Sequence, residues 1–184
     1  TVIVNGLQSK TLNVDAADTA AKIAATVNGA AESTGVTASA RNVSEFKITT
    51  AGAVSLAIKG DNTTTAANIS FSTTSATDLA EGVKAFNDVS SQTGITAKLN
   101  SAGDGVILTN EAGADIQITN NSTAAAVSLA AQDATANTLT FSTAQATAAG
   151  ATAVSRGTVE FNSDKGFSMG GTSAYVAAGN SSLK

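Results

Sequence analysis

The chain has 184 residues, of which 42% are hydrophobic, and this is enough for one domain or two small ones. Its net charge is −4 and its ten basic residues are scattered singly, so we do not expect a nucleic-acid surface, which requires clustered Lys and Arg. Cys and His are absent, which excludes disulfides, thiolate metal sites and the commonest general base, and no apolar run reaches the length of about 18 residues that a transmembrane helix needs.

Residues 1–60 are expected to form a first repeat of hairpin, helix and hairpin. Asn5-Gly6 is a strong signal for a two-residue turn, and residues 7–14 return as the partner of the first strand. Asp18 is placed to cap a helix whose apolar residues recur at three- and four-residue spacing, namely Ala20, Ile23, Ala24 and Val27. The period then changes to two over residues 36–50, which predicts a pair of half-buried strands.

A second repeat is expected over residues 61–136. We place the boundary before it in the polar, turn-rich segment 60–65. The repeat opens with a strand at 69–72, and a helix follows at about 78–91 with four apolar residues facing inward, namely Leu79, Val83, Phe86 and Val89. Its architecture is therefore predicted to match that of the first repeat.

The second repeat is predicted to end with a hairpin and a closing strand. The hairpin loop is at 101–105, where glycines make positive φ angles easy, and the strand is at 116–119. The segment 120–133 is rich in Ala, Ser and Asn, and we leave it unassigned because residues 124–129 fit a short helix and a strand equally well.

Residues 137–184 are expected to be C-terminal strands that return to the first lobe. Residues 139–143 repeat the pattern of residues 69–73, as though a third unit began there, and residues 144–153 are then expected to form its helix.

The two repeats also share sequence, which becomes apparent when the chain is shifted by 59 residues. The shift places Thr93-Gly94-Ile95-Thr96-Ala97 on Thr34-Gly35-Val36-Thr37-Ala38, and it places Asn87 on Asn28. Each match is weak alone, but the matches occur in the same order along the chain. They indicate a duplicated unit.

The stretch DTAAKIAATVNGAAESTGVTASA, residues 18–40, resembles a motif of helix, Thr-Gly-Val-Thr-Ala and strand that occurs in the variable outer part of bacterial flagellins. A related motif occurs in the flagellar cap protein. The stretch RGTVEFNSDKGFSM, residues 156–169, is similar to the strand pair that leads many flagellins back into their conserved C-terminal helix, which favours flagellin over the cap. The chain lacks the family's long Asn-, Gln- and Arg-rich terminal helices, so it resembles outer domains within a longer protein.

Together these patterns predict an α+β protein of two related lobes, each a small antiparallel sheet or set of hairpins packed on one helix. The resemblance implies a structural function in the extracellular flagellar filament, where the domain would be surface-exposed, serve motility and act as an antigen. Its partners would be other flagellin subunits, bound through terminal regions that this sequence does not contain, and the fragment itself is expected to be monomeric. The resemblance also allows hydroxyl-linked glycans on exposed Ser and Thr, with no residue favoured.

The flagellin interpretation also makes a geometric demand. A domain inserted into a stalk must return the chain close to where it received it. The strand at residues 2–4 is therefore expected to pair with residues 158–161 or 167–169.

Two alternatives remain open at this point. One is a carbohydrate-binding or adhesion module of a cell-surface protein, because small Ser- and Thr-rich sheet domains often bind sugars. Such sites usually display an aromatic platform, and Tyr175 is the only Tyr or Trp in the chain. The other is the outer domain of the flagellar cap protein.

No catalytic, cofactor-binding or metal site is predicted. Asp104, Glu111 and Asp115 lie near a Gly-rich turn and invite a calcium-site interpretation, but their spacing matches no known loop, so we interpret them as turn carboxylates. Gly103-x-Gly105 and Gly170-Gly171 are likewise interpreted as turns, since neither opens a convincing helix with a nearby Lys to cradle a phosphate.

No enzymatic activity is predicted either. A serine nucleophile would need a base other than His, and we interpret Ser90-Ser91 with Lys84, and Ser163 with Lys165, as chance proximities in a Ser-rich chain. Six Asn-x-Ser/Thr sequences are interpreted as accidents of composition, and they begin at Asn42, Asn62, Asn68, Asn120, Asn121 and Asn180.

Overall fold

The protein is seen in a computed structural model that describes residues 1–133, 141, 144–171 and 179–181. Three antiparallel sheets with a few short helices make up this part of the chain, which confirms the α+β prediction. The chain divides into two compact units, which we call unit 1 (residues 1–40 and 159–184) and unit 2 (residues 41–158). Every helix within the described ranges is too short or too polar to cross a membrane.

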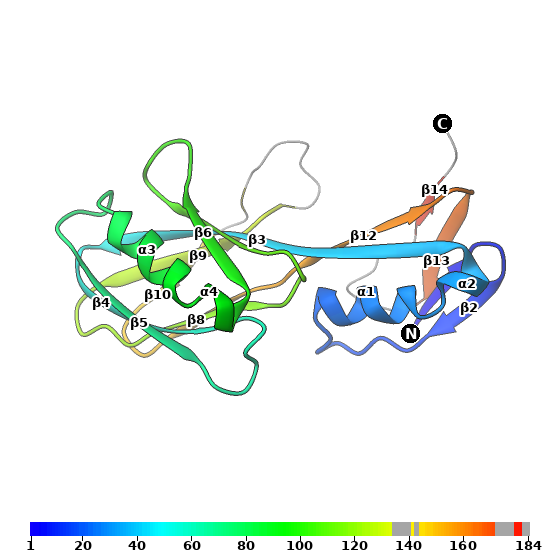
Figure 1. Ribbon diagram of the computed structural model, residues 1–184, viewed down its shortest axis with the longest axis horizontal. Helices are drawn as coiled ribbons and strands as arrows, with labels where there is room; N and C mark the ends of the chain where they lie inside the picture. Colours follow the sequence, from blue (N-terminus) through cyan, green and yellow to red (C-terminus); the bar gives the residue numbers. More distant parts are fainter. Residues whose placement is uncertain (134–140, 142–143, 172–178, 182–184) are drawn as a thin grey trace. The chain divides into compact units, whose positions relative to one another are not determined.

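Unit 1 is built on a four-stranded sheet with the order β14-β13-β1-β2 (Figure 1). The strands are β1 (Val2–Asn5), β2 (Ser9–Leu12), β13 (Phe167–Gly171) and β14 (Gly179–Ser181). Helix α1 (Ala20–Asn28) packs against this sheet, and the one-turn helix α2 (Ala31–Thr34) follows it. The apolar residues predicted for the helix, Ala20, Ile23, Ala24 and Val27, are all buried, as predicted from their spacing.

Strand β1, the first strand of the chain, pairs with β13. Val2 of β1 lies opposite Gly171 of β13, and Val4 lies opposite Met169, in antiparallel register. This is one of the two pairings expected from the sequence, and it is confirmed. The expectation that C-terminal strands return to the first lobe holds for β13, which belongs to unit 1.

Strand β3 (Val36–Thr50) is one continuous strand, so the prediction of two strands at residues 36–50 is wrong. Its middle section was mistaken for a turn because it contains polar residues, but Asn42 and Ser44 are buried there. The Asn42 side chain donates hydrogen bonds to the carbonyl oxygens of Ala114 (2.9 Å) and Ser155 (2.8 Å). These bonds offset the cost of burying its polar amide. Strand β12 (Thr158–Ser163) pairs with β3.

Unit 2 contains the other two sheets, which have the strand orders β10-β9-β3-β7-β6 and β11-β8-β4-β5. The strands not yet introduced are β4 (Gly52–Lys59), β5 (Ala67–Thr73), β6 (Ile95–Leu99), β7 (Val106–Asn110), β8 (Ile116–Asn120), β9 (Ala126–Ala131), β10 (Gln145–Thr147) and β11 (Thr152–Ser155). The helices are α3 (Ala80–Asp88) and α4 (Ser90–Thr93), and α3 packs against β5 and β6 (Figure 1).

One hydrophobic core fills unit 2, and both of its sheets and α3 contribute to it. Leu79 and Phe86 are buried in this core, while Val83 and Val89 are half-buried against it, so the predicted inward face of the helix is confirmed. The ring of Phe86 meets that of Phe46 edge to face, with 5.3 Å between the ring centroids and 70° between the planes.

The duplicated unit is visible in the hydrogen bonds. In the first copy Gly35 adopts a left-handed conformation (φ 68°), and the carbonyl oxygen of Thr34 accepts the N–H of Leu7 at 2.7 Å. In the second copy Gly94 has the same φ, and the Thr93 carbonyl accepts the N–H of Asp61 at 2.9 Å. A Cβ atom on Gly6 would collide with the Thr34 carbonyl, and one on Gly60 would collide with that of Thr93, so close backbone approach requires glycine in both copies.

The expected domain boundaries differ from the division seen in the structure. Segment 60–65 is the turn of the β4/β5 hairpin, in which Leu56 lies opposite Ile69, so it falls inside the second copy and not before it. That hairpin corresponds to β1/β2, in which Val2 lies opposite Leu12. The second copy therefore begins with β4, and residues 60/61 and 136/137 do not separate the two units.

Several local predictions also need correction. The helix expected at 144–153 is replaced by strands β10 and β11, and the unassigned segment contains strand β9. The cap of α1 is Thr19, whose hydroxyl accepts the backbone N–H of Lys22 at 3.3 Å, rather than Asp18. The turn after Asn5 has three residues, since Asn5 pairs with Ser9. The proposed third unit at 139–143 lies outside the described residues, apart from Phe141.

Candidate functional site

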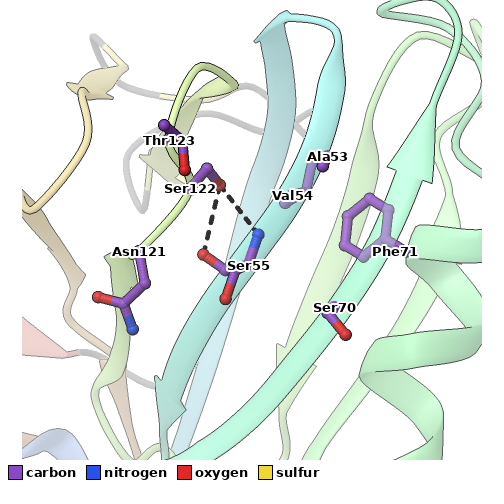
Figure 2. A pocket seen from close by; sticks show the side chains of 8 residues that line it. All are labelled: Ala53, Val54, Ser55, Ser70, Phe71, Asn121, Ser122 and Thr123. Carbon is purple, nitrogen blue, oxygen red and sulfur yellow. Dashed lines mark hydrogen bonds between the residues drawn. The ribbon is translucent and has the colours of Figure 1, made fainter.

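A pocket lies in unit 2, where the hairpin β4/β5 meets the segment after β8 (Figure 2). Strand alternation brings Ser55 opposite Ser70 on the outer face of this sheet. The pocket is lined by Ala53, Val54, Ser55, Ser70, Phe71, Asn121, Ser122 and Thr123. Its volume of about 340 Å³ lies at the small end of the range of roughly 300–1,000 Å³ for small-molecule sites.

Ser122 fixes one wall of this pocket. Its hydroxyl accepts the N–H of Ser55 at 2.9 Å and donates to the Ser55 carbonyl at 3.3 Å, as the dashed lines of Figure 2 show. The backbone N–H of Ser122 is in turn held by the side-chain oxygen of Asn120 at 3.0 Å. The segment after β8 is therefore attached to β4 by the Ser122 side chain and by the backbone N–H of Asn121, which donates to the Ser55 carbonyl at 2.8 Å.

The chemistry available in the pocket is that of neutral hydrogen bonding. The lining presents the hydroxyls of Ser55, Ser70 and Thr123, the amide of Asn121 and the half-buried ring of Phe71, and no lining residue is charged. Such a surface suits an uncharged polar ligand, but it offers neither a nucleophile with a base nor a general acid.

A second hollow lies beside the C-terminal end of β6, and Glu45, which lines it, belongs to a network of charged side chains. Lys47 donates to Asp104 at 3.0 Å and lies 3.6 Å from Glu45. The hydrogen bond from Asn100 and then that from Lys47 lower the pKa of Asp104, while the hydrogen bond to Asp104 raises the pKa of Lys47. These groups stabilise the hairpin loop at 101–105.

The structure does not bring the three candidate calcium carboxylates together. Asp104 pairs with Lys47, and Glu111 pairs with Arg41 at 3.0 Å. Asp115 is partly buried, and burial raises its pKa although Arg156 opposes the effect. Among the residues that the structure describes, no group of three or more such side chains is placed to hold a metal ion.

The serines, lysines and glycines considered as candidate site residues are found in ion pairs, backbone hydrogen bonds, a turn and a strand. Lys84 pairs with Asp88 at 2.8 Å, and the Ser163 hydroxyl donates to the Gly35 carbonyl at 2.8 Å, so neither forms a serine-base pair. Gly103 lies in the predicted turn with φ 75°, but Gly170 and Gly171 lie in β13 and not in a turn. Tyr175 and the sequon residue Asn180 lie where no side chain is described.

Sequence reasoning missed a set of buried asparagines that hold the backbone. Asn42, Asn110 and Asn120 are completely buried, and their side chains bond to backbone groups of neighbouring segments. A signal was present, since each lies in phase with the inward apolar residues of its strand, as Asn120 does with Ile116 and Ile118. Two of the six sequons therefore begin at residues that are closed to modification.

No protein-family model matches this chain, and no curated protein matches it at a significant level.

Proposed function

We propose that this chain is a surface-exposed outer domain of the protein that forms the bacterial flagellar filament. Its role is structural, and it contributes to the filament's outer surface and to its antigenicity. The proposal rests on the resemblance of residues 18–40 and 156–169 to flagellin motifs.

The pairing of β1 with β13 is the structural observation that carries the proposal. Because Val4 lies opposite Met169, β13 brings the chain back beside the strand in which it entered unit 1, before the chain continues into β14. This is the arrangement that an insertion into a longer protein requires. The duplicated unit adds support, because both copies have the Thr-Gly turn that is part of the flagellin-like motif.

The site chemistry is compatible with a structural role. The pocket of Figure 2 has no charged lining residue, and the candidate carboxylates are dispersed into hairpins and ion pairs. In this proposal the partners are other filament subunits, which bind through regions outside this sequence, and secretion places the domain outside the cell.

Immunogold electron microscopy tests the proposal. Antibodies raised against residues 1–184 are applied to unpermeabilised cells that produce the full-length protein, and cells from which its gene is deleted serve as the control. We expect gold along the whole length of the filaments. Gold confined to filament tips would point to the cap protein, and gold on the cell body alone would point to an adhesion module. Either pattern would overturn the proposal.

A further inference from the structure

Three side-chain amides bind strand edges in the same way. Asn87 donates to the carbonyl oxygen of Ala97 at 2.9 Å and accepts the N–H of Ala97 at 2.8 Å. Asn28 makes the same two bonds to Ala38, at 2.8 and 2.7 Å. Gln145 makes them to Val154, at 3.0 and 3.3 Å.

Each amide occupies the place of a neighbouring strand. The N–H and C=O groups of one strand residue point to the same side of the strand. An amide that binds both groups therefore fills the two hydrogen-bonding positions that this residue offers to a neighbouring strand. Ala97 lies in β6 and Val154 lies in β11, and each of these strands ends its sheet. Ala38 lies in β3, which pairs with β12 on its other side. The amides therefore bind the groups that a further strand would use.

The β6 edge shows most clearly what such a contact prevents. Leu99 of this strand is 47% exposed, and Thr96 and Lys98 are exposed as well, so the strand lies at the molecular surface. An open edge strand pairs readily with the same strand of another copy, and proteins commonly reduce this with Lys residues and with covering groups. Asn87 supplies a covering group, and Lys98 adds a positive charge that a second copy pairing with this strand would have to approach.

We propose that the side-chain amides of Asn28, Asn87 and Gln145 close these strand edges against pairing with a second copy of the chain. The edges are thus a self-association surface that the amides keep occupied. The inference rests on the hydrogen bonds and on the sheet order, and it stands whether or not the chain belongs to a filament.

Sedimentation analysis over a wide concentration range tests the proposal on the full chain. The variants are Asn87→Ala and the double variant Asn87→Ala/Lys98→Ala, and the matched control is Asn68→Ala, which removes an exposed asparagine of β5. We expect the parent and the control to stay at 18.0 kDa. The mass of Asn87→Ala should rise with concentration towards twice that value, and the double variant should associate at lower concentration.

Hydrogen exchange supplies the readout that separates edge closure from simple stabilisation. The Ala97 amide should exchange about tenfold faster in dilute Asn87→Ala, as loss of one hydrogen bond implies, and association should restore its protection. If exchange accelerates while the mass stays at the monomer value at every concentration, the proposal is refuted, because the bond then serves only to attach α3 to β6.

Gln145→Ala is an independent variant that decides the matter if Asn87→Ala fails to fold. Gln145 is exposed, so its removal disturbs no core, and Gln92→Ala on α4 is the matched control. Concentration-dependent association of Gln145→Ala, but not of Gln92→Ala, supports the proposal. A monomeric Gln145→Ala at all concentrations contradicts it.

Discussion

Asn120→Ala is expected to be one of the most destabilising single substitutions in unit 2. The Asn120 side chain is completely buried at the end of β8. It donates to the carbonyl oxygens of Ala125 (3.0 Å) and Thr147 (2.8 Å), and it accepts the N–H of Ser122 at 3.0 Å. It thereby joins β8, the start of β9 and β10 at one point.

The magnitude follows from the three backbone groups that lose their partner. Each buried group left without a hydrogen bond costs about 1–3 kcal/mol, and the loss is reduced where water enters. We therefore expect a total of roughly 3–6 kcal/mol, which is a large share of the roughly 5–15 kcal/mol by which proteins of this size are stable. The corresponding fall in the melting temperature is roughly 10–20 °C.

Urea and thermal unfolding followed by circular dichroism measure this effect. The control is Asn121→Ala, which removes the neighbouring asparagine, whose side chain is exposed and should change stability by less than about 0.5 kcal/mol. If Asn120→Ala has the same urea midpoint and melting temperature as Asn121→Ala, the buried Asn120 side chain does not stabilise this fold, and the reasoning is wrong.

Three further predictions concern the core, one carboxylate and the assembly state. Phe86→Ala should cost roughly 3–5 kcal/mol, because Phe86 is fully buried and meets Phe46 edge to face, and wild-type-like melting would contradict the observed core. Burial raises the pKa of Asp115 above its unfolded value, so its charged form reduces stability at neutral pH. Asp115→Asn should therefore melt higher than the parent at pH 7, and this gain should shrink as the pH falls towards about 4 and be lost below it; a gain independent of pH would refute the assignment. The isolated chain should scatter light as an 18.0 kDa monomer, and a stable dimer would count against this expectation.

Periodicity predicted the parts of the fold in which one face is apolar. The three- and four-residue spacing of Ile23 and Val27 gave α1, and that of Leu79 and Phe86 gave α3, because both helices bury one narrow stripe. The pairing of β1 with β13 was also predicted, although from a resemblance rather than from local sequence.

The errors arose where polar residues lie inside the protein. Asn42 and Ser44 looked like a turn within β3, but their side chains bond to buried backbone and each other, so the strand continues. Segment 60–65 looked like a boundary between repeats because polar turns and linkers have the same composition. Tertiary hydrogen bonds decide such cases, and they leave no periodic signal.

The Ala-rich segments were ambiguous for another reason. Alanine favours helices, yet Ala153 is buried in β11, and Gln145 of β10 bonds to Val154. Short strands in these segments are defined by their partners, such as Ile118 opposite Ala153, and not by their own residues. The edge-binding amides were missed because an exposed Asn or Gln gives no indication of what it binds.

The central claim, that this chain is an outer domain of the flagellar filament protein, is tested most directly by the composition of purified filaments. Filaments are sheared from cells that produce the full-length protein, washed, and digested for quantitative mass spectrometry. We expect peptides of residues 1–171 to be present in a one-to-one ratio with those of the most abundant filament subunit, because they belong to the same chain. If these peptides are absent from the filaments, or present only at the few copies that a filament tip would hold, the proposed function is contradicted.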